Sequence, residues 1–329
     1  MAEPLRVAVI GVGSMWANHV RVLRELPDAT LAAIAEVDEE RRGRAAEGER
    51  AYADYRTLLA EERLDAVSIA VPTRLHEQVA LACIERGLPL LVEKPLAADL
   101  DECLRLRDAA RAADVPLMVG QVERFNPAVQ ELRQRLAAGE AGRVLQVRAK
   151  RVGPFFERER DVGVVHDLAT HDIDVFRYLL GVEVERVQAE TQRGVRTEFE
   201  DALAATLRFE DGTVGALEVN WLTPIKVREL TVLGERGMFV LDYLSQTLRF
   251  FDAKLGDLGA VQPQVATFPG AGAAPLRAEL AAFLRAAQRA EPPAVDAGDA
   301  IAAMRVAEAL VESANAGEPV RVAAQGTAR

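Results

Sequence analysis

Three ionisable side chains recur at helical spacing within Asp161–Asp174, whose sequence is DVGVVHDLATHDID. Asp167, His171 and Asp174 follow one another at intervals of four and three residues, so a helix would place them on one face. An imidazole with a carboxylate one turn before it is suited to take a proton near neutral pH. His171 is therefore a candidate general base. The structural alternatives are a core histidine and a helix-capping role for Asp167.

A second stretch, Gly11–His19 (GVGSMWANH), nearly completes the G-x-G-x-x-G pattern of a dinucleotide-binding loop. It follows the apolar strand pattern Leu5–Ile10 and opens an amphipathic helix, which is the context that such a loop requires. Gly11 permits a tight turn, and Gly13 lets the backbone approach a pyrophosphate. Trp16 occupies the place of the third glycine, where its bulk must tilt the helix or turn toward the nucleotide. We expect an intact but reshaped cofactor site.

Glu36 follows the glycines by about twenty residues, near the end of the strand pattern Leu31–Val37. A carboxylate at this position binds ribose hydroxyls and repels a 2′-phosphate, which favours NAD over NADP. The alternative is an ordinary strand–turn–helix with chance glycines. The combination of strand, loop, helix and acid favours the cofactor site.

The tripeptide Glu93-Lys94-Pro95 directly follows the apolar strand pattern Leu90–Val92. Ligands of doubly wound sheets bind at the carboxyl ends of the strands. A partly desolvated lysine there can accept or relay a proton. A salt bridge between Lys94 and Glu93 is the structural alternative.

Three arginines, Arg124, Arg151 and Arg228, are candidates for the anionic end of a substrate, because guanidinium groups match phosphate oxygens. Each could instead form an internal ion pair. Trp221 could stack on a sugar or a base, although core packing is the favoured interpretation. The four histidines and two cysteines of the chain show no metal-ligand spacing, so no metal is expected.

Strand patterns alternate with helical patterns over the first 120 residues, which predicts right-handed crossovers and a parallel, doubly wound sheet. Beyond the predicted helix start at Asn126-Pro127, alternating strands follow one another, and Asp211-Gly212 predicts a tight hairpin. The fold class is therefore α/β: an N-terminal Rossmann-type domain and a C-terminal α+β domain with a large open, mostly antiparallel sheet. We expect domains at 1–121 and 122–329, with a C-terminal helix that can return to the first domain. Residues 41–51 are helix-like, and 253–273 are expected to form a loop.

The composition limits the classes of function. The chain has 329 residues and a net charge of -11, which argues for two domains and against general nucleic-acid binding. No apolar run approaches the roughly 18 to 20 residues of a membrane span, and the N-terminus lacks a signal-peptide pattern. Cys83 and Cys103 are expected to be buried thiols. We therefore expect a cytoplasmic protein without membrane or nucleic-acid partners.

Several of these stretches together resemble the glucose–fructose oxidoreductase/inositol dehydrogenase (Gfo/Idh/MocA) family over nearly the whole chain. They are VEKPLA, VGQVERFNPAV, VSIAVPTRLHEQVA, the glycine loop and residues 161–174. The segments RVGPF and NWLTPIKVRELTVLGERG are most similar to bacterial and archaeal UDP-N-acetylglucosamine 3-dehydrogenases and their sugar-nucleotide relatives. Trp16 departs from the pattern, as does Gln121, where those relatives commonly carry histidine.

The resemblance implies a site in which Lys94, Asp167 and His171 act together. His171 is expected to be the general base, Lys94 a hydrogen-bonding partner and relay, and Asp167 the residue that orients the substrate; the two proton roles could be exchanged. The residues expected around NAD are Gly11, Gly13, Ser14, Met15, Trp16, Glu36, Val71, Pro72, Thr73, His76, Glu93, Lys94 and Gln121. For His76, helix capping is the alternative. The residues expected around the substrate are Arg124, Asn126, Arg151, Asp167, His171 and Arg228.

The resemblance also implies an NAD-dependent dehydrogenase that transfers a hydride from a sugar hydroxyl to NAD, expected at C3 of a UDP-N-acetylhexosamine. A dehydrogenase of a free sugar or inositol is the alternative enzyme. A non-catalytic nucleotide or sugar sensor with a degenerate glycine loop is the alternative from another class. Helices of this chain leave one face of the open sheet uncovered, and a bare apolar face would be unusual. We therefore expect a homodimer or homotetramer through that sheet.

Overall fold

The computed structural model describes residues 3–11, 16–155, 162–252, 264–267 and 275–323. The chain divides into two compact units. Unit 1 contains residues 1–122 and 273–301, and unit 2 contains residues 123–272 and 302–329. None of the helices in the described ranges is both long enough and apolar enough to cross a lipid bilayer.

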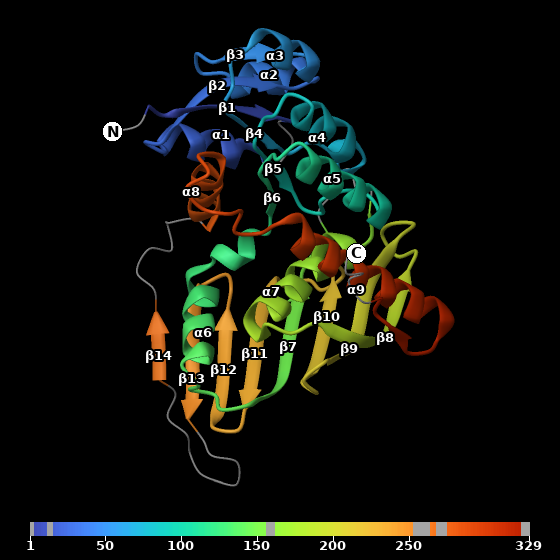
Figure 1. The fold of residues 1–329 in the computed structure, drawn as a ribbon. Coiled ribbons are helices and arrows are strands. Elements are labelled where there is room, and N and C mark those ends of the chain that lie inside the picture. Colours follow the sequence, from blue (N-terminus) through green and yellow to red (C-terminus); the bar gives the residue numbers. More distant parts are fainter. Residues whose placement is uncertain (1–2, 12–15, 156–161, 253–263, 268–274, 324–329) are drawn as a thin grey trace. The chain divides into compact units, whose positions relative to one another are not determined.

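In the described part of unit 1, six strands form a sheet in the order β3-β2-β1-β4-β5-β6 (Figure 1). The strands are β1 Leu5–Ile10, β2 Ala29–Ala35, β3 Arg50–Tyr52, β4 Ala66–Ile69, β5 Leu90–Glu93 and β6 Leu117–Gly120. The helices are α1 Trp16–Glu25, α2 Glu39–Ala45, α3 Tyr55–Glu61, the 3-10 turn η1 Thr73–Leu75, α4 His76–Ile84, α5 Leu100–Ala112 and α8 Pro275–Ala287. All neighbouring strands pair in parallel. This is the strand order of dinucleotide-binding sheets, whose ligands bind where β1 and β4 diverge.

The apolar runs of the sequence account for this sheet. Parallel strands that helices cover on both faces are apolar on both faces, and every residue of β4 and β6 is buried. One prediction for this unit was wrong. The helix expected over residues 41–51 ends at Ala45, and Arg50–Tyr52 instead pairs with β2 at the edge of the sheet. A strand of three residues is too short to show a period-two pattern in the sequence.

Unit 2 contains, in its described part, a nine-stranded sheet in the order β14-β13-β12-β11-β7-β10-β9-β8-β15. The strands are β7 Val144–Val152, β8 Val184–Arg193, β9 Glu200–Phe209, β10 Val214–Asn220, β11 Val227–Gly234, β12 Gly237–Asp242, β13 Thr247–Asp252, β14 Gln264–Thr267 and β15 Val320–Arg321. Only β7 and β10 pair in parallel among these strands. The predicted hairpin forms at Gly212, whose φ is 88°. The loop expected over residues 253–273 contains β14, which pairs with β13.

Helices cover one face of this sheet (Figure 1). They are α6 Pro127–Ala137, the π-helical turn η3 Val165–Ala169, α7 Thr170–Leu180 and the unit 2 part of α9 Ala297–Ala316; the 3-10 turn η2 Val122–Phe125 precedes α6. Every second residue of β9 points into the core beneath them, including Leu203, Leu207 and Phe209. The alternation of the sequence thus sets which face the helices cover.

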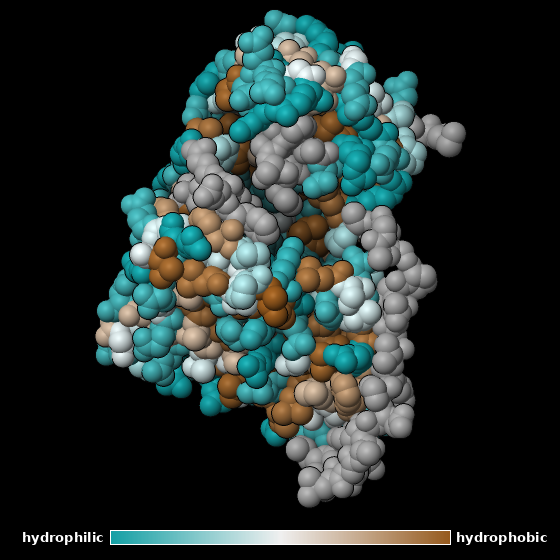
Figure 2. Space-filling model, turned by 180° about the vertical axis from the view of Figure 1, so that it is seen from behind, coloured by the Kyte–Doolittle hydropathy of each residue, from teal (hydrophilic) through white to brown (hydrophobic). Residues whose placement is uncertain are grey.

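The opposite face of the sheet is largely polar over β7, β8, β9 and β10, which differs from the expected apolar face, and Leu233 of β11 is an apolar residue exposed on it. Arg148, Gln188 and Thr206 are exposed on it, and Lys150 Nζ lies 3.3 Å from a carboxylate oxygen of Glu218 on the neighbouring strand. Figure 2 shows hydrophilic and hydrophobic residues mixed over the molecule seen from behind. Such a surface can remain in water, because its charged side chains are solvated or paired.

Candidate active site

The turn that follows β1 requires glycine at position 11, as the sequence pattern predicted. Gly11 has a φ of 91°, and a Cβ atom at this position would lie 2.6 Å from the backbone nitrogen of Val71. Only glycine fits so close an approach of the loops that follow β1 and β4. Gly13, Ser14 and Met15 lie outside the described residues. Trp16 begins α1, but its side chain is likewise outside the part that the structure describes.

Glu36 directly follows β2, as the sequence predicted. Its side chain is largely buried, with 8% of the residue exposed, and its Oε1 accepts a hydrogen bond of 3.0 Å from the Asp38 backbone. Nη1 of Arg42 donates to the Glu36 carbonyl at 2.7 Å. A carboxylate at the end of β2 and a glycine turn after β1 are the features that a dinucleotide with free ribose hydroxyls needs. These residues therefore fit NAD.

His76 lies in a different environment from the one that the sequence suggested. It is 1% exposed, and both ring nitrogens face backbone carbonyls: Nδ1 lies 2.8 Å from Pro95 O and Nε2 lies 2.9 Å from Val71 O. Neither contact caps a helix, and the buried ring has no face left for a direct cofactor contact. His76 instead joins the loop after β4 to the loop after β5.

The residues around His76 remain candidates for the cofactor edge. Val71 and Pro72 follow β4, and Thr73 begins η1 as a largely buried residue. Gln121 follows β6 and is 3% exposed. Glu93 ends β5, and its carboxylate contacts both the Lys94 backbone N–H at 3.2 Å and the His19 ring at 2.8 Å. Lys94 itself is half-buried at the carboxyl end of the sheet.

In unit 2, Asp167 and His171 come from two different kinds of helix. Asp167 belongs to the π-helical turn η3, and His171 is the second residue of α7. Both side chains are half-buried. A π-helical turn contains an extra residue and occurs frequently at functional sites. It therefore sets how the Asp167 carboxylate lies relative to the His171 ring.

Arg124 and Arg151 have internal partners. The Arg124 guanidinium binds both carboxylate oxygens of Asp174, at 2.7 and 2.6 Å. Arg151 binds both oxygens of Asp172, at 2.6 and 3.1 Å, and one oxygen of Glu123 at 2.9 Å. Burial by itself would lower the pKa of Arg151, but the charges of Asp172 and Glu123 raise it above its usual value. These two arginines thus serve the core of unit 2, and the expected contact with a phosphate does not fit their geometry.

Arg228 differs from the other two arginines. It is half-buried, its Nη1 donates to the carbonyls of Val152 and Val227 at 2.7 and 3.0 Å, and it forms no direct ion pair with a described carboxylate. Burial, followed by the charge of Arg151, lowers its pKa to about 10. The Asp167 carboxylate lies near enough to raise that pKa in part. Arg228 therefore remains a cation in reach of the predicted catalytic face of unit 2.

Two other residues of unit 2 have structural contacts. Asn126 is the N-cap of α6, where its side chain accepts from Ala128 N and donates to the Tyr243 carbonyl at 3.2 Å. Trp221 is 2% exposed, its indole N–H donates to Asp201, and its ring packs edge-on against Phe155. The core interpretation of Trp221 is confirmed. The capping bonds of Asn126 leave its substrate contact as a prediction.

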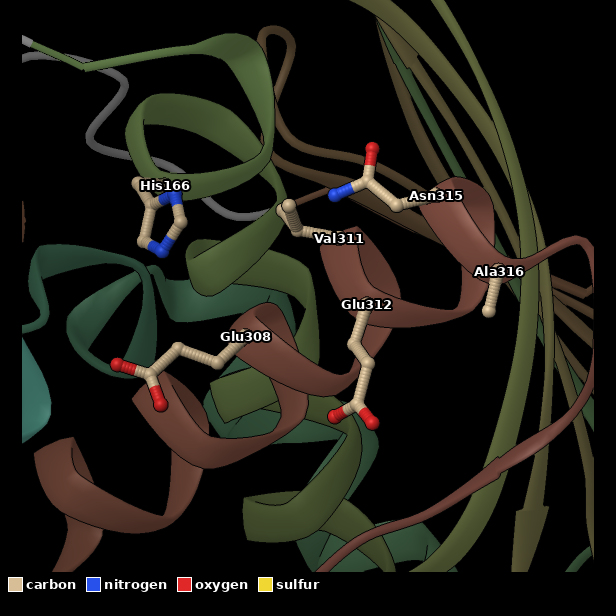
Figure 3. Close-up of a pocket in the computed structure, with 6 residues that line it drawn as sticks. All are labelled: His166, Glu308, Val311, Glu312, Asn315 and Ala316. Atoms are coloured by element: carbon tan, nitrogen blue, oxygen red, sulfur yellow. The ribbon is translucent and has the colours of Figure 1, made fainter.

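A surface hollow of about 580 Å³, which was not predicted from the sequence, lies beside η3. Figure 3 shows His166 on one wall and residues of α9, including Glu308, Glu312 and Asn315, on the other. Burial lowers the pKa of His166, while Glu200 raises it. The hollow is acidic and belongs to unit 2 alone.

Two family models and several known proteins are similar to this chain. Residues 5–121 match the model of the Gfo/Idh/MocA oxidoreductase family, described as an NAD-binding Rossmann fold, and residues 129–240 match the model of that family's C-terminal domain. Inositol 2-dehydrogenase 2 of Saccharopolyspora erythraea is 32% identical over 98% of this chain and 97% of its own. UDP-N-acetylglucosamine 3-dehydrogenase of Acidithiobacillus ferrooxidans is 32% identical over 78% of this chain and 80% of its own. A solved structure of the latter enzyme aligns with a TM-score of 0.84 and 28% identity, covering 96% of this chain and 99% of the other.

Proposed function

This chain belongs to the Gfo/Idh/MocA family of NAD-binding oxidoreductases, and from that premise we propose that it oxidises the C3 hydroxyl of a UDP-linked N-acetylhexosamine. The choice of substrate rests on the environment of Arg228. A half-buried guanidinium without a direct carboxylate partner among the described residues favours an anionic ligand, because it is costly to withdraw a charge from water without a counter-charge. The similarity to a UDP-N-acetylglucosamine 3-dehydrogenase supports the same substrate class.

The residues of unit 1 would hold the cofactor at the carboxyl end of the sheet. The tight turn at Gly11 brings the loops after β1 and β4 together, and Glu36 stands where ribose hydroxyls are bound. NAD, when bound there, supplies the hydride acceptor. Val71, Pro72, Thr73, Glu93 and Gln121 are the other described residues proposed to line this edge.

The proposed chemistry divides one oxidation between a hydride and a proton. An alcohol that becomes a ketone loses both, and His171 is the residue proposed to take the proton. Lys94 is proposed to donate a hydrogen bond to the same substrate oxygen and to relay the proton, while Asp167 orients the sugar. Each of these three roles rests on residue type, half-buried position and family pattern.

A neutral cyclic polyol such as inositol is the second candidate substrate. Two observations favour it. Arg124 and Arg151 are neutralised by Asp174 and Asp172, which removes two of the three predicted phosphate ligands. In addition, an inositol 2-dehydrogenase matches nearly the full length of the chain.

The two candidates are separated by a direct assay. The purified protein is mixed with NAD and either UDP-N-acetylglucosamine or myo-inositol, and the near-ultraviolet absorbance of NADH is followed. We expect reduction of NAD with the nucleotide sugar and a 3-keto product by mass spectrometry and NMR. Turnover of myo-inositol alone would refute the nucleotide-sugar proposal. Tight binding of NAD without turnover of any sugar would revive the sensor alternative.

We also propose that copies of the chain associate through the open face of the large sheet. The face carries both signs of charge, including Arg148, Lys150, Glu190 and Glu218, around the small side chains of Ala204 and Ala216. A two-fold axis brings the same patch of two copies together, so a surface of mixed charge can complement itself.

A further inference from the structure

Two buried histidines of unit 1 contact the tripeptide Glu93-Lys94-Pro95. We propose that His19 and His76 are positioning residues for Lys94: His19 acts through the Glu93 carboxylate, and His76 acts through the Pro95 carbonyl. The inference rests on the proposed role of Lys94 in proton transfer.

His19, on α1, is the centre of a chain of hydrogen bonds. Its Nε2 lies 2.8 Å from Glu93 Oε1, and its Nδ1 lies 2.9 Å from the Ser68 hydroxyl on β4. A carboxylate only accepts hydrogen bonds, so Nε2 of His19 carries a proton and donates to Glu93, while Nδ1 pairs with the Ser68 hydroxyl. His19 and Ser68 are both fully buried. Both ring nitrogens of His19 therefore have a partner, and neither is left for a substrate contact.

Glu93, which His19 holds in place, also binds the backbone of Lys94. Its second carboxylate oxygen, Oε2, accepts the Lys94 backbone N–H at 3.2 Å. Burial would raise the pKa of Glu93, but the hydrogen bond and charge of His19, together with Lys94, hold it below its usual value. The carboxylate thus stays ionised and fixes the backbone from which the lysine side chain extends.

Strand β6, which pairs with β5, leaves room for the Glu93 carboxylate. Gly120 pairs with Glu93 across the sheet, and a Cβ atom at Gly120 would lie 3.1 Å from Glu93 Oε2 and 3.2 Å from its Cα and Cδ. These distances are too short for an unshifted carboxylate. Gly120 therefore permits the position that His19 stabilises.

His76 holds the other end of the tripeptide. Its two ring nitrogens face the carbonyls of Pro95 and Val71, and a carbonyl only accepts hydrogen bonds. Burial lowers the pKa of His76, while the two carbonyls and the Glu93 charge raise it in part. A neutral ring donates to one of the two carbonyls at a time. The contact with Pro95 is the one that bears on Lys94, because Pro95 is the next residue.

Substitution of each histidine by glutamine or by asparagine tests the two contacts of its ring one at a time. Glutamine places its amide nitrogen near the position of a histidine Nε2, and asparagine places it near that of Nδ1. H19Q therefore keeps a hydrogen-bond donor for Glu93, whereas H19N keeps only a polar group near Ser68. Likewise, H76N keeps a donor for Pro95, whereas H76Q keeps only the side that faces Val71.

We expect kcat to follow the contact with the tripeptide. H19N and H76Q should lower kcat by about 100-fold, which is the cost of a displacement on the order of 1 Å at a reacting group. H19Q and H76N should retain kcat within a small factor of the wild type. KM for the sugar and the Kd for NAD should change little in all four variants. G120A should lower kcat by a smaller factor than H19N, because its Cβ atom requires only a small shift of the same carboxylate.

Cys83→Ala is the matched control, since Cys83 is a fully buried free thiol in the same unit and lies on α4 rather than in the tripeptide. It should lower the melting temperature and leave kcat unchanged. Equal losses of kcat in the glutamine and asparagine variants, in proportion to their melting temperatures, would overturn the inference.

A second readout does not need turnover. The rate at which a succinimidyl ester acylates Lys94 in the NAD-loaded protein is measured by peptide mass spectrometry. H19N and H76Q should change this rate, and H19Q and H76N should keep the wild-type rate. A wild type that turns over no sugar would refute the proposed function, and unchanged acylation in all variants would refute the positioning roles.

Discussion

At the scale of single residues, the arginines of unit 2 show how the same side chain can serve two purposes. Arg124 and Arg151 bind carboxylates in two-pronged contacts, while Arg228 donates only to carbonyl oxygens among its described hydrogen bonds. Their acidic partners, Asp172 and Asp174, lie in the same motif as His171. The two ion pairs therefore hold α7 in place, and α7 contains His171, the proposed general base.

Arg124→Ala should destabilise the protein without acting on the substrate. It would leave the Asp174 carboxylate, which is 1% exposed, without its buried partner. Breaking such a pair costs about 3–5 kcal/mol in the free energy of unfolding. Urea denaturation measures the loss. The double variant with Arg124→Met and Asp174→Leu should recover most of it, and equal stability of the single variant and the wild type would contradict the prediction.

Arg228→Ala should act on the substrate instead. Loss of a charged hydrogen bond worth about 1.5–3 kcal/mol would raise KM for UDP-N-acetylglucosamine by roughly 10- to 100-fold. Steady-state kinetics measure this change, and Arg228→Lys should lie between the alanine variant and the wild type. KM for myo-inositol should stay constant. A similar rise in KM for both substrates would argue against a phosphate contact.

At the scale of elements, η3 sets the register between Asp167 and His171. The π-helical turn Val165–Ala169 precedes the regular α-helix, and one residue of an α-helix corresponds to a rotation of about 100°. Deletion of Leu168 should therefore rotate Asp167 away from His171 and lower kcat by 100-fold or more. Calorimetry should show an unchanged Kd for NAD, because the binding residues lie in unit 1. Retained kcat in the deletion variant would show that the register is unimportant.

A second element-scale prediction concerns the contact of α1 with the segment before β3. Nε and Nη2 of Arg24 bind the two oxygens of Glu49 at 2.7 and 2.8 Å, and the side-chain hydrogen bond from Arg24 lowers the pKa of Glu49 to about 2 from 4.5. Because the folded-state pKa is the lower one, the pair stabilises the fold above pH 4.5, and this contribution is lost as the pH falls toward 2. The free energy of unfolding of Glu49→Gln should depend less steeply on pH in that window than that of the wild type. Parallel curves would contradict the assignment.

At the scale of the whole molecule, substitution of one small residue by a large charged one tests the proposed association through the open face of the large sheet. Ala204 is exposed on this face, so Ala204→Arg should convert an oligomer to monomers in sedimentation velocity. Ala112→Arg, at an exposed position of α5 in unit 1, is the control and should leave the assembly intact. A monomeric wild type would refute the proposal.

Much of the fold and part of the site could be predicted from the sequence. Alternating and helical periods distinguished the parallel sheet from the open one, and the glycine at position 11 and the acid at position 36 occupy the predicted places. These features act over a few neighbouring residues, so the local pattern is enough to reveal them. The short edge strands β3 and β14 were missed because their formation depends on pairing with another strand.

The chain's own pattern was thus enough to predict which residues are candidates for the chemistry: the glycine turn, the lysine after β5 and the acid–histidine spacing across η3 and α7. Tertiary structure alone decided their partners. Arg124 meets Asp174 across 50 positions of sequence, and His19 meets Glu93 across 74. The reason is physical: helix and strand periods arise from adjacent residues, whereas an ion pair or a buried hydrogen bond requires two distant segments to be brought together by a common core.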